Sequence, residues 1–188
     1  MNLLEAIHTR RAVRAYTAER VEESVLREVL SAAVYAPSAM NAQPWLFAVV
    51  QDVRQLKRYS DRAKEMAIAR TPADPKSRHY AARMRSEQFN VFYDATTLVA
   101  IGSAERGTYT DADCWLAASN FMLAACNAGL GTCPIGFAVP VLNTPEAKAE
   151  LMFPHAGAVV APIIVGYPSA EPAPVPRAQA RIVSWSRS

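Results

Sequence analysis

The spacing of apolar residues predicts a chain of mixed helices and strands. Val21, Val25 and Val29 lead into a pair of alanines at a spacing of about three to four residues, which indicates an amphipathic helix within residues 17–36. Residues 111–131 form a second strong pattern, with acidic residues at the start and a glycine at the end, as helix termini prefer. This stretch is apolar on nearly every face, so we expect nearly every face to be buried.

Weaker patterns complete the prediction. Further helices are expected at residues 2–9, 52–70 and 144–152 and from Lys76 onward, and strands at residues 46–51, 94–102 and 156–168. These elements lack the strict strand–helix–strand alternation of a parallel sheet, and no glycine-rich phosphate loop follows a strand. The pattern therefore predicts an α+β fold. After Pro168 the chain becomes proline-rich, and we expect an extended tail over residues 168–188.

Composition places residues 1–188 in a single globular domain. With 188 residues, 51% of them hydrophobic and 20% charged, the chain can bury a core without disulfides or metals. No apolar run approaches the roughly 20 residues that span a bilayer, and the first residues lack the apolar centre of a signal peptide. The three cysteines are odd in number and lie in apolar surroundings. We therefore expect a cytoplasmic protein without membrane contact.

The charge balance is mildly basic, with a net charge of +3 and a pI near 8.9. Nucleic-acid binding would require a basic stripe with interleaved aromatic residues, and the lysines and arginines form no such stripe. The cysteines and histidines also lack the spacing of metal ligands. We expect neither a nucleic acid nor a metal as partner. The positive charge is either a solvated surface or a group of cations around a bound anion.

Three stretches carry candidate chemistry. "HTRRAVRAY" places Arg10, Arg11 and Arg14 after a helix, where their guanidinium groups either bind phosphate oxygens in pairs or remain solvated. "APSAMNAQPW", residues 36–45, is an irregular stretch between a helix and a strand, which either turns the chain or follows a flat ligand. "GLGTCPIGF", residues 129–137, either allows close backbone approach to a ligand or simply ends a helix and begins a strand.

In this order the stretches resemble the flavin-dependent nitroreductase family. The similarity also includes "FYDATTLVAIG", "IIVGYP" and a terminal Arg-x-x-x-x-Ile-Val-x-Trp, so it covers essentially the whole chain. The resemblance implies an α+β fold in which helices flank an antiparallel sheet. It also implies a homodimer with two FMN sites built by both chains, C-terminal tails that wrap over the partner subunit, and a dimer core formed by the helix near residues 111–130.

The resemblance further implies roles for individual residues. Arg10 and Arg11 would hold the ribityl phosphate, and Arg14 would reach the pyrimidine edge of the flavin. The other implied FMN-binding residues are Pro37, Ser38 and Asn41 from the partner chain, Asn90 at the polar edge of the ring, Pro134, Ile135 and Gly136 against the isoalloxazine, and Arg177 as a second phosphate ligand. Ala12 departs from the family, which commonly has a small hydroxyl residue there, and removes a hydrogen bond worth about 0.5–1.5 kcal/mol.

The implied activity is oxidation of NADH or NADPH and reduction of a nitroaromatic, a quinone or a similar flat acceptor, by a ping-pong hydride mechanism. The flavin carries this redox chemistry, so no catalytic side chain is expected. Two alternatives stay open. Relatives with this fold dehalogenate substrates or fragment the flavin with the help of a lid, which here falls at residues 70–90 with Arg78, His79, Tyr80 and Arg83. The second alternative is a flavin-binding redox sensor without turnover.

Overall fold

A four-stranded antiparallel sheet in the order β1-β2-β4-β3 forms the centre of the molecule. The structure is a computed structural model that describes residues 1–71 and 81–187. The strands are β1 (Trp45–Val50), β2 (Thr97–Ser103), β3 (Gly131–Pro134) and β4 (Ala158–Gly166). The helices are α1 (Leu3–Thr9), α2 (Glu23–Ala33), α3 (Val53–Arg70), α5 (Thr110–Asn127), α6 (Val139–Leu142) and α7 (Pro145–Glu150), with 3-10 turns η1 (Ala39–Asn41) and η2 (Gly136–Ala138). Residues 81–85 are also helical. The predicted α+β fold, with helices flanking an antiparallel sheet, is confirmed.

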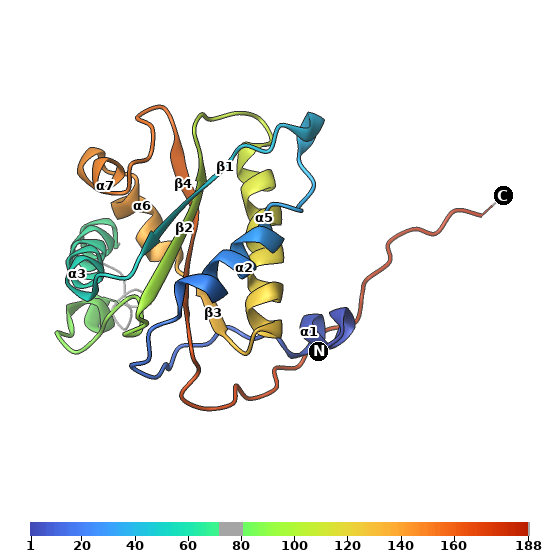
Figure 1. Cartoon of the computed structure of the whole chain (residues 1–188), viewed down its shortest axis with the longest axis horizontal. Helices are drawn as coiled ribbons and strands as arrows, with labels where there is room; N and C mark the ends of the chain where they lie inside the picture. Colours follow the sequence, from blue (N-terminus) through green and yellow to red (C-terminus); the bar gives the residue numbers. More distant parts are fainter. Residues whose placement is uncertain (72–80, 188) are drawn as a thin grey trace.

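Helices cover both faces of this sheet (Figure 1). Side chains alternate between the faces of a strand, so neighbouring residues of one strand enter different cores. Ile163 of β4 packs with Phe121 of α5 in one core, whereas Ile164 packs with Leu56 of α3 and Leu142 of α6 in the other. Every residue of β2 and β4 is buried as a result.

Two helices differ from the prediction: α2 is shorter than expected, and α5 is more exposed than expected. α2 begins at Glu23, because the preceding residues pair elsewhere: Thr17 N–H donates to Tyr167 O, and Val21 O accepts from Gln51 Nε2. α5 has 18 residues and lies where the pattern at residues 111–131 predicts it, but the sheet, α1 and α2 leave part of its surface exposed. Trp115 and Leu116 are 43% and 44% exposed, so the expected burial of nearly every face is not met within one chain.

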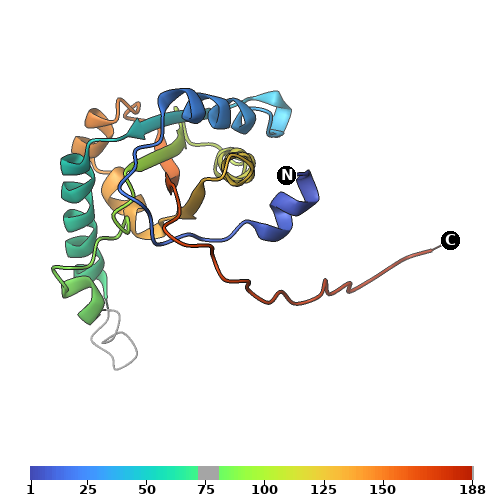
Figure 2. The ribbon, with the colours of Figure 1, turned by 60° about the horizontal axis from the view of Figure 1, so that its bottom comes forward.

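The segment after α1 and the start of the tail run beside the sheet. Ala12 forms a parallel bridge with Thr132 of β3, and Tyr16 forms an antiparallel bridge with Pro168. Residues 171–187 contain no helix or strand, and Figures 1 and 2 show the tail passing α1 and then leaving the body of the molecule. Among the described helices, none is long and apolar enough to cross a membrane.

The helix expected from Lys76 onward begins outside the described residues. Arg78, His79 and Tyr80 of the expected lid lie there too. The strand expected at residues 94–102 is β2, which begins three residues later because a turn occupies residues 90–94.

Candidate functional site

The pairing of the N-terminal segment with β3 gathers the three arginines of the first candidate stretch. Arg10 follows directly after α1, and the bridge between Ala12 and Thr132 lays the next residues along β3. Arg14 thereby reaches the Cys133 thiol. Burial raises the pKa of Cys133, while the positive charge of Arg14 acts in the opposite direction. The structure therefore brings Arg10, Arg11 and Arg14 to one edge of the sheet.

Arg11 has an unsatisfied donor at this edge. Its Nη1 donates to the backbone oxygens of His8 at 2.6 Å and Arg10 at 2.9 Å. Its Nε is buried and has no hydrogen-bond partner among the residues that the structure describes. A buried N–H without an acceptor costs about 1–3 kcal/mol, and more for a charged group, so such a donor usually marks the place of a missing acceptor.

A cavity of about 490 Å³ lies beside Arg10 and Arg11, and Arg14 is not among its lining residues. We call it the arginine cavity. Its lining includes Arg10, Arg11, Val13, Thr132, Pro168 and Glu171. Glu171 contributes a carboxylate from the tail, yet within residues 1–71 and 81–187 no ion pair to Arg10, Arg11 or Arg14 forms. The cavity thus combines positive charge with room for a ligand.

Pro134, Ile135 and Gly136 follow at the end of β3. Pro134 has no N–H, and Ile135 is buried and donates its N–H to Pro162 O at 2.8 Å. Gly136 is exposed, and a Cβ atom built on it would meet nothing within 4 Å. Open space therefore lies against the backbone at Gly136.

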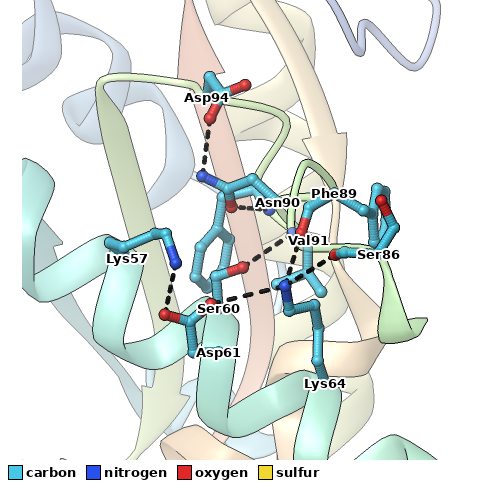
Figure 3. A network of polar contacts seen from close by, with 10 residues as sticks. Lys57, Ser60, Asp61, Lys64, Ser86, Phe89, Asn90, Val91 and Asp94 are labelled. Carbon is cyan, nitrogen blue, oxygen red and sulfur yellow. Dashed lines mark hydrogen bonds and ion pairs between the residues drawn. The ribbon is translucent and has the colours of Figure 1, made fainter. Parts of the chain in front are cut away.

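Asn90 lies in a closed turn near Arg14. Its Oδ1 accepts from Phe92 N–H, and its Nδ2 donates to Asp94 Oδ1, both at 2.9 Å (Figure 3). The ring of Tyr93 in this turn lies 5.8 Å from the guanidinium carbon of Arg14. The structure therefore places the Asn90 turn beside the arginine group.

The loop with Pro37, Ser38 and Asn41 lies at the other end of α5. Ala39 N–H donates to Oδ1 of the buried Asp113 in the first turn of α5 at 3.1 Å. The arginine cavity instead reaches Cys126 in the last turn of α5. These two helix positions are about 20 Å apart at 1.5 Å per residue. Within one chain, the structure does not bring this loop to the arginines.

The backbone of this loop is strained. Met40, Asn41 and Gln43 have φ angles of 54°, 54° and 47°, in the left-handed region that favours glycine and asparagine. Ser38 Oγ accepts from Gln43 N–H, and Asn41 Oδ1 accepts from Gln43 Nε2, both at 3.0 Å. The Asn41 amide therefore keeps its Nδ2 donor for another partner. Strain of this kind concentrates at ligand-binding positions.

Arg177 is not placed with the other arginines. It lies exposed on the tail, as do Arg181 and Trp185. Tyr93 is the residue near this site that the sequence pattern did not single out. Its contact with Arg14 joins distant parts of the chain, and no local spacing signals such a contact.

Comparison with known proteins decides the family. The sequence model described as "Nitroreductase family" matches residues 7–167. The chain belongs to the nitroreductase family. The resemblance inferred from the motifs is thereby confirmed. Metal-ligand clusters of three or more His, Cys, Asp or Glu do not occur in the described parts of this nitroreductase-family chain.

Other members of the nitroreductase family align with most of the chain. The "Putative NADH dehydrogenase/NAD(P)H nitroreductase" of Archaeoglobus fulgidus is 30% identical over 176 residues, 89% of this chain and 86% of that protein. The iodotyrosine deiodinase of Thermotoga neapolitana is 28% identical over 178 residues, which are 88% of this chain and 88% of that protein. A crystal structure of a nitroreductase with bound FMN from Bacteroides fragilis matches with a TM-score of 0.81 and 29% identity, over 100% of this chain and 99% of that one. These matches support an oxidoreductase.

Proposed function

We propose that this protein is an FMN-dependent NAD(P)H oxidoreductase that reduces nitroaromatics, quinones or similar flat acceptors. The observation that carries the proposal is the buried, unpartnered Nε of Arg11 beside the arginine cavity. A phosphate oxygen is the acceptor that a guanidinium group binds best, and FMN brings a phosphate. FMN is bound in the similar structure from Bacteroides fragilis. The residues present thus fit this cofactor.

The phosphate would be held by Arg10 and Arg11, with Arg177 as a further ligand in the dimer. Thr132 lines the same cavity and pairs with Ala12. Its hydroxyl group is therefore close to the position where the family commonly has one, and it compensates in part for the alanine. Other cations around the phosphate also reduce the effect of that missing hydrogen bond.

The ring would lie between β3 and a loop of the partner chain. Arg14 and Asn90 would face its pyrimidine edge, and Pro134, Ile135 and Gly136 would lie against the isoalloxazine. Because Pro134 lacks an N–H and that of Ile135 is bonded to Pro162 O, the Gly136 N–H is the amide we assign to the cofactor.

The proposal includes a partner chain because the loop with Asn41 lies far from the arginines of its own chain. Pro37, Ser38 and Asn41 are separated from the arginines by most of the length of α5. A dimer that packs the exposed face of α5, with Trp115 and Leu116, would bring the loop of one chain to the arginines of the other. Tail exchange belongs to the same proposal.

FMN held by Arg10 and Arg11 would supply the hydride-transfer chemistry between a reduced nicotinamide and the acceptor. The chain contributes orientation and charge. Arg14 places a positive charge where negative charge develops at the pyrimidine edge. The open space at Gly136 would receive the isoalloxazine, and the donor and the acceptor would use the exposed face of the ring in turn. Because the donor and the acceptor would share this face, they cannot bind at the same time, and we expect ping-pong kinetics.

Reductive dehalogenation is the alternative that one comparison favours. A relative that aligns with 88% of this chain is named iodotyrosine deiodinase. Flavin fragmentation and redox sensing without turnover complete the set of candidate functions. The reactions differ in acceptor and in the fate of the cofactor, so a single panel of assays separates them.

The experiment is to release the cofactor from the purified protein and to measure turnover with NADH and NADPH. Nitroaromatic, quinone and halogenated acceptors are compared. We expect FMN, and parallel double-reciprocal lines with a nitro or quinone acceptor. Arg11→Gln should lose FMN, while Arg20→Gln, a change of an exposed arginine that bonds to Gln51, should not. A protein that neither contains nor takes up FMN contradicts the proposal, and faster turnover of the halogenated acceptor favours the deiodinase-like alternative.

A further inference from the structure

Two polar residues on the buried side of α3 hold the segment that leads into the Asn90 turn (Figure 3). Ser60 is fully buried, and Lys64, one turn later, is only 9% exposed. The Lys64 ammonium donates to the backbone oxygens of Ser86 at 3.1 Å and Phe89 at 3.0 Å. Ser60 Oγ accepts from Val91 N–H at 3.0 Å. Backbone groups on both sides of Asn90 are therefore attached to α3.

The buried ammonium is not required for packing. Taking a charged group out of water costs several kcal/mol, and the carboxylate of Asp61, which lies 3.5 Å from the Lys64 ammonium, also pairs with Lys57 at the surface. The core around this part of α3 is apolar and includes Met84 and Phe92. A methionine at position 64 would fill the same space. Lys64 instead supplies N–H donors to the backbone oxygens of Ser86 and Phe89, which lie in a segment that is neither helix nor strand.

The turn that follows needs this support. Tyr93 and Asp94 have φ angles of 52° and 57°, a conformation that is unfavourable for a tyrosine. The Asn90 side chain closes the turn through Phe92 N–H and Asp94 Oδ1. A strained turn persists where its surroundings hold it in place, and the attachments to α3 lie just before this one.

The far end of the turn reaches the arginine group. The Tyr93 ring packs edge-on against Phe89 at 5.7 Å and lies 5.8 Å from the guanidinium carbon of Arg14. Lys64 fixes the backbone of Phe89, so the contacts form a continuous path from α3 to Arg14. Any shift of residues 86–91 would displace both Asn90 and the ring beside Arg14.

We propose that Lys64 is a positioning residue of the flavin site: through the backbone of Ser86 and Phe89 it sets the place of Asn90 and Arg14 at the pyrimidine edge. The inference rests on the proposed function and deepens it. Lys64 does not touch the cofactor in this account. Ser60 assists by fixing Val91 from the same face of α3.

The test compares Lys64→Met with Lys57→Met, a matched change of the exposed lysine that pairs with the same Asp61. FMN is removed from each purified protein and titrated back, and the midpoint potential of the bound flavin is measured. We expect Lys64→Met to weaken FMN binding by about tenfold and to shift the potential at temperatures where the protein remains folded by circular dichroism. Lys57→Met should change neither quantity, and Lys64→Arg, which keeps several donors, should restore part of the affinity.

A Lys64→Met protein with FMN affinity within about twofold of the wild type, and with an unchanged potential, would show that Lys64 serves stability alone. If the Lys64→Met protein does not fold, Ser60→Ala is tested in its place. We expect Ser60→Ala to bind FMN several-fold more weakly than the wild type. Unchanged FMN binding would contradict the inference. A wild-type protein that binds no FMN contradicts the proposed function as well. Normal loading of the wild type and of all variants contradicts only the role of Lys64.

Discussion

At the scale of single residues, the site is defined by positive charge that no ion pair neutralises within the described part of the chain. Arg11 uses Nη1 on two backbone oxygens and leaves Nε buried without an acceptor. Arg14 lies beside an aromatic ring and a buried thiol, and neither group carries a formal negative charge. Folding this edge of the sheet therefore has an electrostatic cost, which a bound phosphate would offset.

Because of this cost, we expect Arg11 to contribute little to stability without FMN and much to FMN binding. Arg11→Met keeps most of the side-chain length and removes the unpartnered Nε–H. We expect the stability of the protein without FMN to change by about 1 kcal/mol or less, because the removal of a buried donor without an acceptor offsets the loss of the Nη1 hydrogen bonds to His8 O and Arg10 O. FMN binding should weaken by about ten- to a hundredfold, since a charge-assisted hydrogen bond is lost. Urea denaturation and FMN titration measure the two quantities, and a clear loss of stability without FMN would show that Arg11 is structural.

Arg14 should act on the flavin's potential rather than on its retention. Arg14→Met removes a positive charge that favours the more negative, reduced form of the cofactor. We expect the midpoint potential to fall by about 30 mV, which corresponds to about 1.4 kcal/mol for a two-electron couple. FMN affinity of the oxidised protein should change much less than for Arg11→Met. Equal loss of FMN in both variants with unchanged potentials would make Arg14 another phosphate ligand.

At the scale of elements, the sequence predicts what local periodicity encodes. α5 and β4 have long, regular apolar patterns and lie where these patterns place them. β3 has four residues, too few for a period, so the sequence offered the start of a strand at residues 129–137 only as one of two interpretations, and the pairing with β4 shows the strand. Arg10, Arg11 and Arg14 could be found because their motif is continuous in the chain. The contacts of Lys64 and Tyr93 are tertiary, and no local pattern predicts them.

Gly102 is required by the packing of the fold, whereas Gly136 is required only by the proposed flavin site. A Cβ atom at Gly102, beside the irregularity between β2 and β4, would lie 2.0 Å from Ala158 O. At Gly136 it would meet nothing within 4 Å. We expect Gly102→Ala to destabilise the protein by about 3 kcal/mol or more, because backbone would have to move. Gly136→Ala should leave stability without FMN within about 0.5 kcal/mol and still weaken FMN binding.

Urea denaturation without FMN, followed by FMN titration of the variants that fold, checks this pair. If Gly136→Ala destabilises the protein without the cofactor, the open space at this backbone is filled by protein groups. If it binds FMN like the wild type, the assignment of Gly136 to the isoalloxazine face is wrong.

At the scale of the whole molecule, the candidate residues form two groups that one chain keeps apart. The strained loop with Asn41 is held at the start of α5 through Asp113, and the arginines lie near its end. The exposed Trp115 and Leu116 of α5 and the tail that leaves the body are both surfaces that a second copy of the chain would cover. The proposed dimer would explain these features together, because two-fold symmetry would bring each loop to the other chain's arginines.

Mixed dimers test this arrangement directly. One chain carries Arg11→Met, and the other carries Asn41→Asp, which keeps the shape and the left-handed backbone but replaces the free Nδ2 donor with an acceptor. If each site combines the arginines of one chain with the loop of the other, a mixed dimer has one intact site and one doubly altered site. We expect each parent dimer to bind FMN weakly and the mixed dimer, isolated with two affinity tags, to hold about one FMN with wild-type affinity. The control combines Arg11→Met with Arg10→Met, which should restore nothing because both changes affect the same half of a site. Weak binding in the Arg11–Asn41 mixed dimer would mean that each chain builds its site alone, and the partner loop would then have no part in holding the flavin.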